Sequence, residues 1–260
     1  MKAVMLAAGV ARRLYGEDSN ALPKALLEFD GTTLLERHIQ LLSKNGVDEL
    51  VMVVGHRKED LIEAAQSLAP AGFKVSFVEN PRYKEGPILS LAAAAPAFES
   101  GDNALFMDSD VLYHPLILER LIHSDHQNCF IYDRNYDSNA GVVELRILEG
   151  VAVDFGKEIT GEYDTVGEWP GFLKYSADAA AKLAKATQGF IDRDDLDGAY
   201  EEAMCEVLNN EPAGGFGHID ITGLPWIEID YQEDLDRAED DIKPKLNQNY
   251  RLNGSGWEAC

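Results

Sequence analysis

Two cations on a loop of small residues are the first feature of this sequence with an evident chemical use. The apolar run 3–7 continues through Gly9 to Arg13 and then to Pro23 and Lys24. Small residues let backbone amides approach an anion closely, and the flanking cations supply charge. A nucleoside triphosphate is an anion that suits such a loop. Either cation alone can be an ordinary surface residue, but the pair after a buried strand favours triphosphate binding.

Two pairs of carboxylates form the second feature. Asp108 and Asp110 follow the apolar run LFM, and Glu228 and Asp230 stand in the run LPWIEID. Ligands of open α/β sheets bind at the carboxyl ends of the strands, and carboxylate oxygens suit Mg²⁺. Such residues also cap helices, which is the alternative for Asp230 because a helix is predicted from about Gln232. The two pairs together favour a magnesium site.

The elements that must position these residues alternate in type over the first 130 residues. Short β-branched runs and amphipathic helical patterns follow one another, which is typical of βαβ units. We therefore expect an α/β fold with a mostly parallel, Rossmann-like mixed sheet flanked by helices. Strands are expected at 3–7, 49–54, 74–78 and 104–107, and helices at 33–45, 59–69 and 87–95.

The second half of the sequence is less regular. A hairpin is expected at 142–155 and a loop or lid at 156–171. We expect one domain over residues 1–243 and a flexible tail over 244–260, where proline, asparagine and glycine are frequent. The remaining predictions are helices at 115–123, 177–186, 196–208 and 232–242 and strands at 129–132 and 226–229.

Composition limits the class of protein. The chain has 260 residues and a formal net charge of −23, which argues against a nucleic-acid partner because such partners are held through their phosphates. It lacks an apolar run of about 18 residues, so no membrane span is expected. Its three cysteines form no pairing or metal-binding pattern, and no targeting segment is evident. These features predict a cytoplasmic location.

The opening of the chain resembles the nucleotidyltransferases of the sugar-phosphate type, whose hallmark is LAAGxGxR followed by PK. Ala11 stands where the family usually has the second glycine. The resemblance implies that Arg13 contacts the β- and γ-phosphates and that Lys24 contacts the acceptor phosphate and the reacting α-phosphoryl group. It also implies that the backbone of four residues contacts the base and the α-phosphate: Leu6, Ala7, Ala8 and Gly9.

The same resemblance assigns roles to residues further along the chain. Asp110 and Asp230 would hold Mg²⁺ on the triphosphate, with Asp108 at the nucleotide. Gly86 and Ser90 match positions that build the nucleobase pocket. The runs VAVDFGKEI, GEWPGFLKYS and GLPWIEID are similar to cytidylyltransferases that act on phosphocholine, inositol phosphate or 2-aminoethylphosphonate. The similarity extends over nearly the whole chain, to about residue 241.

In that subgroup, residues 1–130 form the nucleotide-binding half and residues 131–243 the acceptor-binding half. Asp133, Glu168, Trp169 and Tyr175 are then candidates for the acceptor pocket, since carboxylates and aromatic faces suit a cationic amine. The two aromatic residues can equally be core residues. Lys157 is a candidate for the acceptor phosphate, although a surface lysine is the simpler interpretation.

The expected activity is a Mg²⁺-dependent transfer of CMP from CTP to a small phosphonate or phosphorylated alcohol, of the 2-aminoethylphosphonate or phosphocholine type, with release of pyrophosphate. The alternative is a nucleotide-sugar pyrophosphorylase that uses another NTP and a sugar 1-phosphate. A non-catalytic nucleotide sensor is disfavoured because both cations and the paired acids are present. A Rossmann dehydrogenase is disfavoured because no GxGxxG follows the first strand. Similar enzymes are commonly homodimers, so a homodimer is expected.

Overall fold

A seven-stranded mixed sheet forms the centre of the computed structural model, which describes residues 1–16, 18, 20–138, 141–157 and 160–260. Four neighbouring strands are parallel, and three of them are apolar except for one charged residue at an end, as is typical of strands covered on both faces. Their spatial order is β6 (Ala104–Asp108), β1 (Lys2–Ala7), β4 (Glu49–Val54) and β5 (Lys74–Glu79). All four agree with the predicted strands within one or two residues.

The other half of the sheet contains two strands that the sequence pattern did not reveal. β12 (Phe172–Tyr175) lies antiparallel between β6 and β8 (Cys129–Tyr132), and β13 (Gly217–Asp220) adds a parallel edge strand beside β8. β12 is only four residues long and buried throughout, so it shows no alternation of polar and apolar residues. The sheet is therefore mixed and mostly parallel, which confirms the predicted fold class.

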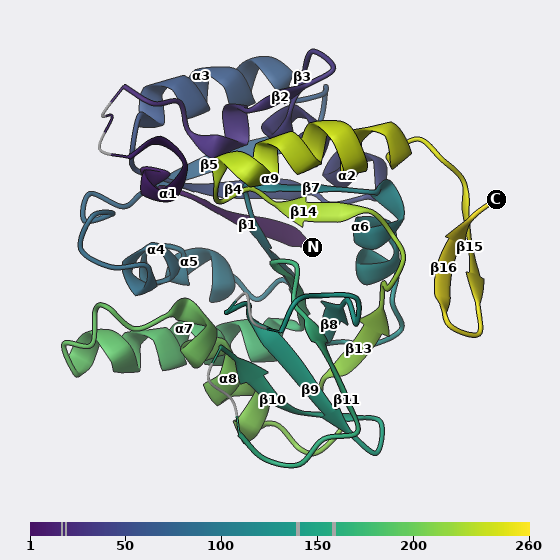
Figure 1. Cartoon of the computed structure of the whole chain (residues 1–260). Coiled ribbons are helices and arrows are strands. Elements are labelled where there is room, and N and C mark those ends of the chain that lie inside the picture. Colours follow the sequence, from purple (N-terminus) through teal and green to yellow (C-terminus); the bar gives the residue numbers. More distant parts are fainter. Residues whose placement is uncertain (17, 19, 139–140, 158–159) are drawn as a thin grey trace.

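Helices cover both faces of this sheet (Figure 1). α2 (Leu34–Lys44) is capped by Thr33, whose hydroxyl accepts a hydrogen bond from the amide of Glu36, and it buries the apolar stripe that its sequence predicts. The helix expected at 87–95 is divided in two, because Pro96 cannot continue the hydrogen-bond ladder of the first part. One face carries α2 (Leu34–Lys44), α3 (Lys58–Leu68) and α6 (Pro115–Ile122); the other carries α4 (Ile88–Ala93), α5 (Ala95–Phe98), α7 (Ala177–Asp192) and α8 (Tyr200–Asn210).

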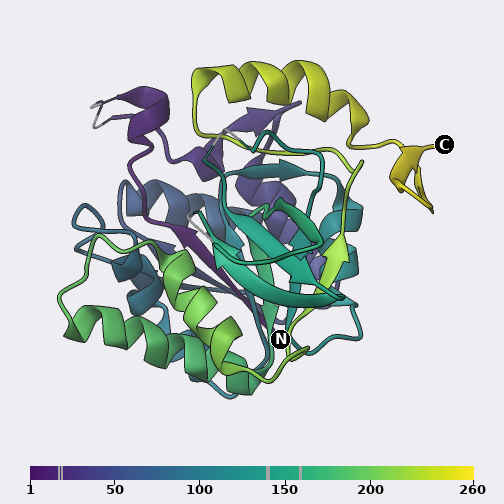
Figure 2. The same cartoon turned by 60° about the horizontal axis from the view of Figure 1, so that its bottom comes forward.

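A second, three-stranded sheet packs near α8 (Figures 1 and 2). The hairpin of β9 (Glu144–Leu148) and β10 (Val151–Gly156) is the predicted one, with Glu149 and Gly150 at positive φ in its turn. The segment 156–171, predicted as a loop or lid, contributes the third strand, β11 (Thr165–Glu168), which pairs with β9. The sequence of β11 shows no clear alternation of buried and exposed positions, because only one of its four residues is buried.

Short elements complete the fold. β7 (Val111–Tyr113) pairs with β14 (Trp226–Glu228), and α9 (Gln232–Arg237) continues into a π-helical turn, Ala238–Ile242. The first loop contains α1 (Arg12–Tyr15) and a 3-10 turn, Lys24–Leu26, followed by the short pair β2 (Glu28–Phe29) and β3 (Thr32–Thr33). Among the helices of the described residues, none combines the length and the apolar character needed to cross a membrane.

The last residues of the chain, predicted as a flexible tail, form regular structure instead. A 3-10 turn, Lys243–Lys245, leads to a hairpin of β15 (Tyr250–Asn253) and β16 (Gly256–Ala259). Both views place this C-terminal hairpin at the side of the molecule, away from α7 and α8. The hairpin lacks an apolar run, and it is held in part by backbone and polar contacts that a sequence pattern does not reveal.

Candidate active site

Two cavities open at the carboxyl edge of the parallel strands and meet there. The smaller, about 430 Å³, is lined by the loop after β1, and the larger, about 1030 Å³, by residues from the second half of the chain. The two share a rim of five residues: Arg13, Pro87, Asp108, Tyr200 and Glu228. A ligand in one cavity can therefore contact a ligand in the other at this rim.

The strand order explains why the first loop and the first acidic pair lie together. β4 and β5 follow on one side of β1, whereas β6 lies on its other side, so the strand order reverses between β1 and β6. In parallel register, Leu6 at the end of β1 is paired with Asp108 at the end of β6. Such a reversal opens a crevice at the carboxyl ends of the strands, which is where open α/β sheets bind ligands.

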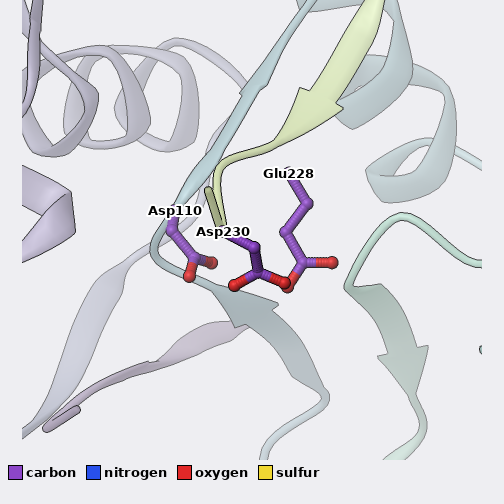
Figure 3. A group of neighbouring side chains, drawn as sticks. All are labelled: Asp110, Glu228 and Asp230. Atoms are coloured by element: carbon purple, nitrogen blue, oxygen red, sulfur yellow. The ribbon is translucent and has the colours of Figure 1, made fainter. Parts of the chain in front are cut away.

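The pairing of β7 with β14 brings the second acidic pair to the same place. Glu228 lies opposite Val111, and the amide of Ile229 donates to the carbonyl of Asp110 at 3.0 Å. The carboxylates of Asp110, Glu228 and Asp230 consequently face one another, with one oxygen of each within 4.8 Å of the others (Figure 3). Residues separated by over a hundred positions in sequence thus form one carboxylate cluster.

The two loop cations are paired with this cluster. The Lys24 ammonium lies 2.9 Å from Asp110 and 2.7 Å from Asp230, and the Arg13 guanidinium lies 2.7 Å from Asp230. Burial by itself would lower the pKa of Lys24, but the charges of Asp110 and Asp230 outweigh it and raise that pKa. Arg13 is more exposed and also lies over the ring of Tyr231. Lys24 therefore remains fully charged between two carboxylates.

Carboxyl groups outnumber cations in this part of the site. The pKa of Glu228 is raised, mainly by desolvation between the cavity walls and also by the charges of Asp110 and Asp230. Its side chain is nevertheless exposed at the cavity surface. Burial and the neighbouring Asp110 raise the pKa of Asp108. Both shifts show that the ionised forms of these carboxyl groups lack stabilisation, which a further positive charge would supply.

The donor set fits a divalent cation. Three carboxyl groups converge, and all the atoms that they offer are hard oxygens. A bound cation would also oppose the raised pKa values of Asp108 and Glu228. Asp110 and Asp230 would have to exchange the Lys24 ammonium for the ion, since Lys24 contacts both of them. The arrangement can therefore hold a metal and release a lysine toward a bound phosphate.

A buried histidine supports the turn that carries the first acidic pair. His38, on α2, is fully buried, and its ring nitrogens lie 3.1 Å from the Tyr113 hydroxyl and 3.3 Å from the Ser109 carbonyl. Burial lowers the pKa of His38 to about 4, so the ring is neutral at physiological pH. His38 packs in the core, and it also fixes the backbone between Asp108 and Asp110.

The smaller cavity contains every residue that the sequence assigned to the nucleotide. Gly86 is required by space, because a Cβ there would lie 1.8 Å from the carbonyl oxygen of Leu196. The side chain of Asn80 donates to the Ser90 hydroxyl at 3.1 Å. Ala11, at φ 53° and ψ 42°, keeps the left-handed conformation that a glycine would adopt freely. The cavity lining includes Leu6, Ala7, Ala8, Gly9, Arg13, Lys24, Gly86, Ser90, Asp108 and Asp110.

The larger cavity contains Asp133 and Glu168, which lie side by side through a backbone bridge between β8 and β11. The Asp133 carboxylate accepts from the Asn135 amide at 2.8 Å and from the Trp226 indole at 2.9 Å. The Glu168 carboxylate receives no hydrogen bond or ion pair from any described residue. Burial and the charge of Asp133 raise the pKa of Glu168 to about 7. This side of the cavity therefore suits a cationic ligand.

The aromatic candidates have separate outcomes. Trp169 lines the larger cavity, but it also packs against Phe106 and Phe155 and donates to the Phe172 carbonyl. Tyr175 lines neither cavity: it is fully buried in the core, so its prediction as a pocket residue was wrong. The central position of β12 in the sheet directs this side chain beneath the helices. Lys157 lines the larger cavity and is exposed there.

Two residues of the site were not predicted. The Tyr200 hydroxyl donates to both oxygens of Asp108, at 2.9 and 3.0 Å, and lies at the rim that the cavities share. The other is Trp226, whose indole donates a hydrogen bond to the Asp133 carboxylate. Trp226 adjoins the second acidic pair in sequence, which was a usable signal, whereas Tyr200 follows a polar segment with no recognisable motif.

Known proteins resemble this chain in sequence. A CMP-5'-(3-aminopropyl)phosphonate synthase of Streptomyces rubellomurinus is 30% identical, over 99% of this chain and 42% of its own length. A bifunctional IPC transferase and DIPP synthase of Rubrobacter xylanophilus is also 30% identical, over 92% of this chain and 51% of its own length. The chain thus spans about half the length of these curated relatives.

Solved structures share the fold. The inositol-1-phosphate CTP transferase of T. maritima aligns with a TM-score of 0.73 at 22% identity, over 94% of this chain and 95% of that one. The CTP:phosphocholine cytidylyltransferase of Streptococcus pneumoniae aligns with a TM-score of 0.71 at 20% identity, over 92% and 97%. The family model for a MobA-like NTP transferase domain matches residues 3–196. The chain therefore belongs to the family of MobA-like NTP transferase domains, as its opening motif indicated.

Proposed function

We propose that this chain is a Mg²⁺-dependent cytidylyltransferase that transfers CMP from CTP to a small phosphonate or phosphorylated alcohol and releases pyrophosphate. The proposed acceptors are of the 2-aminoethylphosphonate or phosphocholine type, in which a cationic amine is close to the phosphorus. One observation carries the proposal: the cavity lined by the loop after β1 and the cavity with an unpaired carboxylate meet at a single cluster of cations and acids. The names of the relatives support the same acceptor class.

In the proposed reaction, an oxygen of the acceptor attacks the α-phosphorus of CTP. A new P–O bond forms while the bond to pyrophosphate breaks, and the electron pair leaves with pyrophosphate. The acceptor oxygen is already anionic, so no proton must be removed. The protein has to bring two anions together and neutralise charge in the transition state.

Lys24 and Arg13 are the residues proposed for that neutralisation. Lys24 lies where the two cavities approach and would leave its carboxylate partners for the reacting phosphoryl group. Arg13 lies on the shared rim and would contact the leaving pyrophosphate. Asp110 and Asp230 would hold Mg²⁺, with Glu228 beside them. Bound Mg²⁺ would neutralise triphosphate charge.

The nucleotide is proposed to lie in the smaller cavity. There the backbone of residues 6–9 would contact the base and the α-phosphate, and Gly86 and Ser90 would face the base. The acceptor is proposed to lie in the larger cavity, with its amine at Asp133 and Glu168 and against Trp169. The chain would thus be divided into a nucleotide half, residues 1–130, and an acceptor half, residues 131–243.

A pyrophosphate-release screen tests this function. CTP, UTP, GTP, ATP and dTTP are crossed with 2-aminoethylphosphonate, 3-aminopropylphosphonate, phosphocholine, inositol 1-phosphate and glucose 1-phosphate. We expect the highest turnover with CTP and an amine-bearing acceptor. Preferred use of UTP or dTTP with glucose 1-phosphate would instead identify a sugar pyrophosphorylase.

The proposal extends to a cytoplasmic location and a homodimer. The three cysteines are free, which is consistent with a reducing compartment. Light scattering after size-exclusion chromatography tests the dimer, which requires twice the chain mass of 28.7 kDa.

A further inference from the structure

The C-terminal hairpin docks by close backbone contact on the turn that follows β13. The amide of Trp257 donates to the carbonyl of Thr222 at 2.7 Å. A Cβ on Gly223 would lie 2.1 Å from the Trp257 carbonyl oxygen, and a Cβ on Gly256 would lie 2.5 Å from the Thr222 carbonyl oxygen. Both glycines are at positive φ. The approach is thus possible because neither position carries a side chain.

Side chains attach the same hairpin to the body of the protein. The Arg120 guanidinium lies 4.9 Å from the centre of the Trp257 ring, and the indole nitrogen of Trp257 donates to the Asp220 carbonyl at 3.4 Å. The ring of His114 meets that of Tyr250 edge to face at 4.9 Å. The hairpin therefore has attachments to α6 as well as to the turn after β13.

Arg134 connects three segments at this position. Its Nε donates to the Asp220 carboxylate at 2.8 Å, and its terminal nitrogen donates to the Ser255 carbonyl at 2.8 Å. Its own backbone amide donates to the Thr222 hydroxyl at 2.9 Å. The end of β8, the turn after β13 and the tip of the hairpin are consequently held by one residue.

Arg134 directly follows Asp133, the carboxylate at the wall of the larger cavity. Gly223 and Leu224 of the docked turn line that same cavity, and Trp226, which donates to Asp133, comes two residues later. The backbone of Asp133 is in turn bridged to that of Glu168. A displacement of the turn would therefore be transmitted to both carboxylates.

We propose that the C-terminal hairpin, through Arg134 and the turn at 220–224, is a positioning element for the Asp133–Glu168 wall of the larger cavity. The inference rests on the proposed function only in treating this cavity as the acceptor pocket. Arg134 and Trp257 are positioning residues: neither lines the cavity. A hairpin that merely covered the core would affect the free energy of unfolding and leave acceptor binding unchanged.

The test compares Arg134→Gln with Arg251→Gln. Arg251 pairs with Glu258 on the exposed side of the same hairpin and, among the described residues, makes no hydrogen bond or ion pair with the turn at 220–224. Hydrogen exchange of the amides at 132–137 and 220–224 measures the wall itself. Steady-state kinetics with 2-aminoethylphosphonate and 3-aminopropylphosphonate measure its consequence. Trp257→Ala serves as a second variant that detaches the hairpin from another point.

We expect Arg134→Gln and Trp257→Ala to speed exchange in both segments and to raise the acceptor KM about tenfold, with less than about twofold change in the CTP KM. Arg251→Gln should match the unaltered protein. Faster exchange with an unchanged acceptor KM would overturn the proposal, as would unchanged exchange in both variants. If the unaltered protein transfers CMP to no acceptor, the proposed function fails, and the exchange data still decide whether the hairpin holds the wall.

Discussion

The two sides of the site treat their carboxylates differently. At the carboxylate cluster, Asp110 and Asp230 are paired with Lys24 at 2.9 and 2.7 Å. At the wall of the larger cavity, Asp133 accepts hydrogen bonds from neutral donors, and the Glu168 carboxylate has no hydrogen bond or ion pair with any described residue. The first side carries its own counter-charges, which can be exchanged for a metal and phosphates. The second side would gain its counter-charge from the ligand.

The largest expected effect comes from removing the cation of the first side. Lys24→Met should reduce CMP transfer by about a thousandfold, because a charge directed at the transition state is lost. The rate of pyrophosphate release measures this loss of transfer. Lys182→Met, which alters an exposed ion pair, should retain full activity. A loss below about tenfold for Lys24→Met would mean that the lysine only balances the acids.

The next effect concerns the acids that this cation contacts. Thermal unfolding with Mg²⁺ or EDTA should show stabilisation by the metal, because an ion that binds only the folded state favours it. Asp110→Asn and Asp230→Asn should abolish that stabilisation, whereas Asp236→Asn, at an exposed position of α9, should retain it. If both site variants respond to Mg²⁺ like the unaltered protein, the cluster is not the metal site.

On the second side, Glu168→Gln should raise the KM of an amine-bearing acceptor about tenfold and leave the CTP KM unchanged, because one charge facing the amine is lost. Glu162→Gln, at an exposed position, is the matched control. An equal rise in the KM for both substrates would argue against a role confined to the acceptor.

The pH dependence sharpens the same comparison. Burial and the charge of Asp133 raise the pKa of Glu168 to about 7, against the opposing charge of Arg237, so Glu168 is largely neutral at pH 6 and largely charged at pH 8. The affinity for the cationic acceptor should therefore increase from pH 6 to pH 8, and Glu168→Gln should flatten this increase. Because the folded protein holds a proton that the unfolded chain releases, Glu168 should also make stability fall as pH rises from its ordinary pKa to about 7. Profiles that are identical in the two proteins would contradict this assignment.

The smallest effect is expected at Ala11. Its left-handed conformation is strained for alanine, so Ala11→Gly relieves strain but adds freedom to the unfolded chain. We expect the free energy of unfolding to change by less than about 1 kcal/mol and transfer to be unaffected. Chemical denaturation measures the change. A large loss of activity would show that the methyl group itself contacts the nucleotide.

The carboxylate cluster and its loop cations were largely predictable from sequence, and the wall of the larger cavity was not. Arg13, Lys24 and the acidic pairs follow buried strands, so the carboxyl edge of a parallel sheet places them together whatever the surrounding detail. Asp133 and Glu168 were named from resemblance, and their proximity depends on β11, a half-exposed strand with no clear pattern.

Tyr175 and the hairpin show two further limits of the pattern. An aromatic residue in a short buried strand looks the same whether it faces a cavity or the core. The docking of the hairpin depends on backbone contacts of Gly223 and Gly256, which apolar periodicity cannot encode. Tyr200, which holds Asp108, depends on where α8 begins and likewise has no local signal.

The most direct test of CMP transfer follows the label from CTP. The protein is incubated with 2-aminoethylphosphonate, Mg²⁺ and CTP labelled with ³²P at either the α- or the γ-phosphorus. We predict that the α-label appears in a product containing the acceptor and that the γ-label appears only in pyrophosphate, with Lys24→Met forming neither. Label transfer from the γ-position to the acceptor, or α-label transfer from UTP to glucose 1-phosphate in preference, would contradict the proposed function.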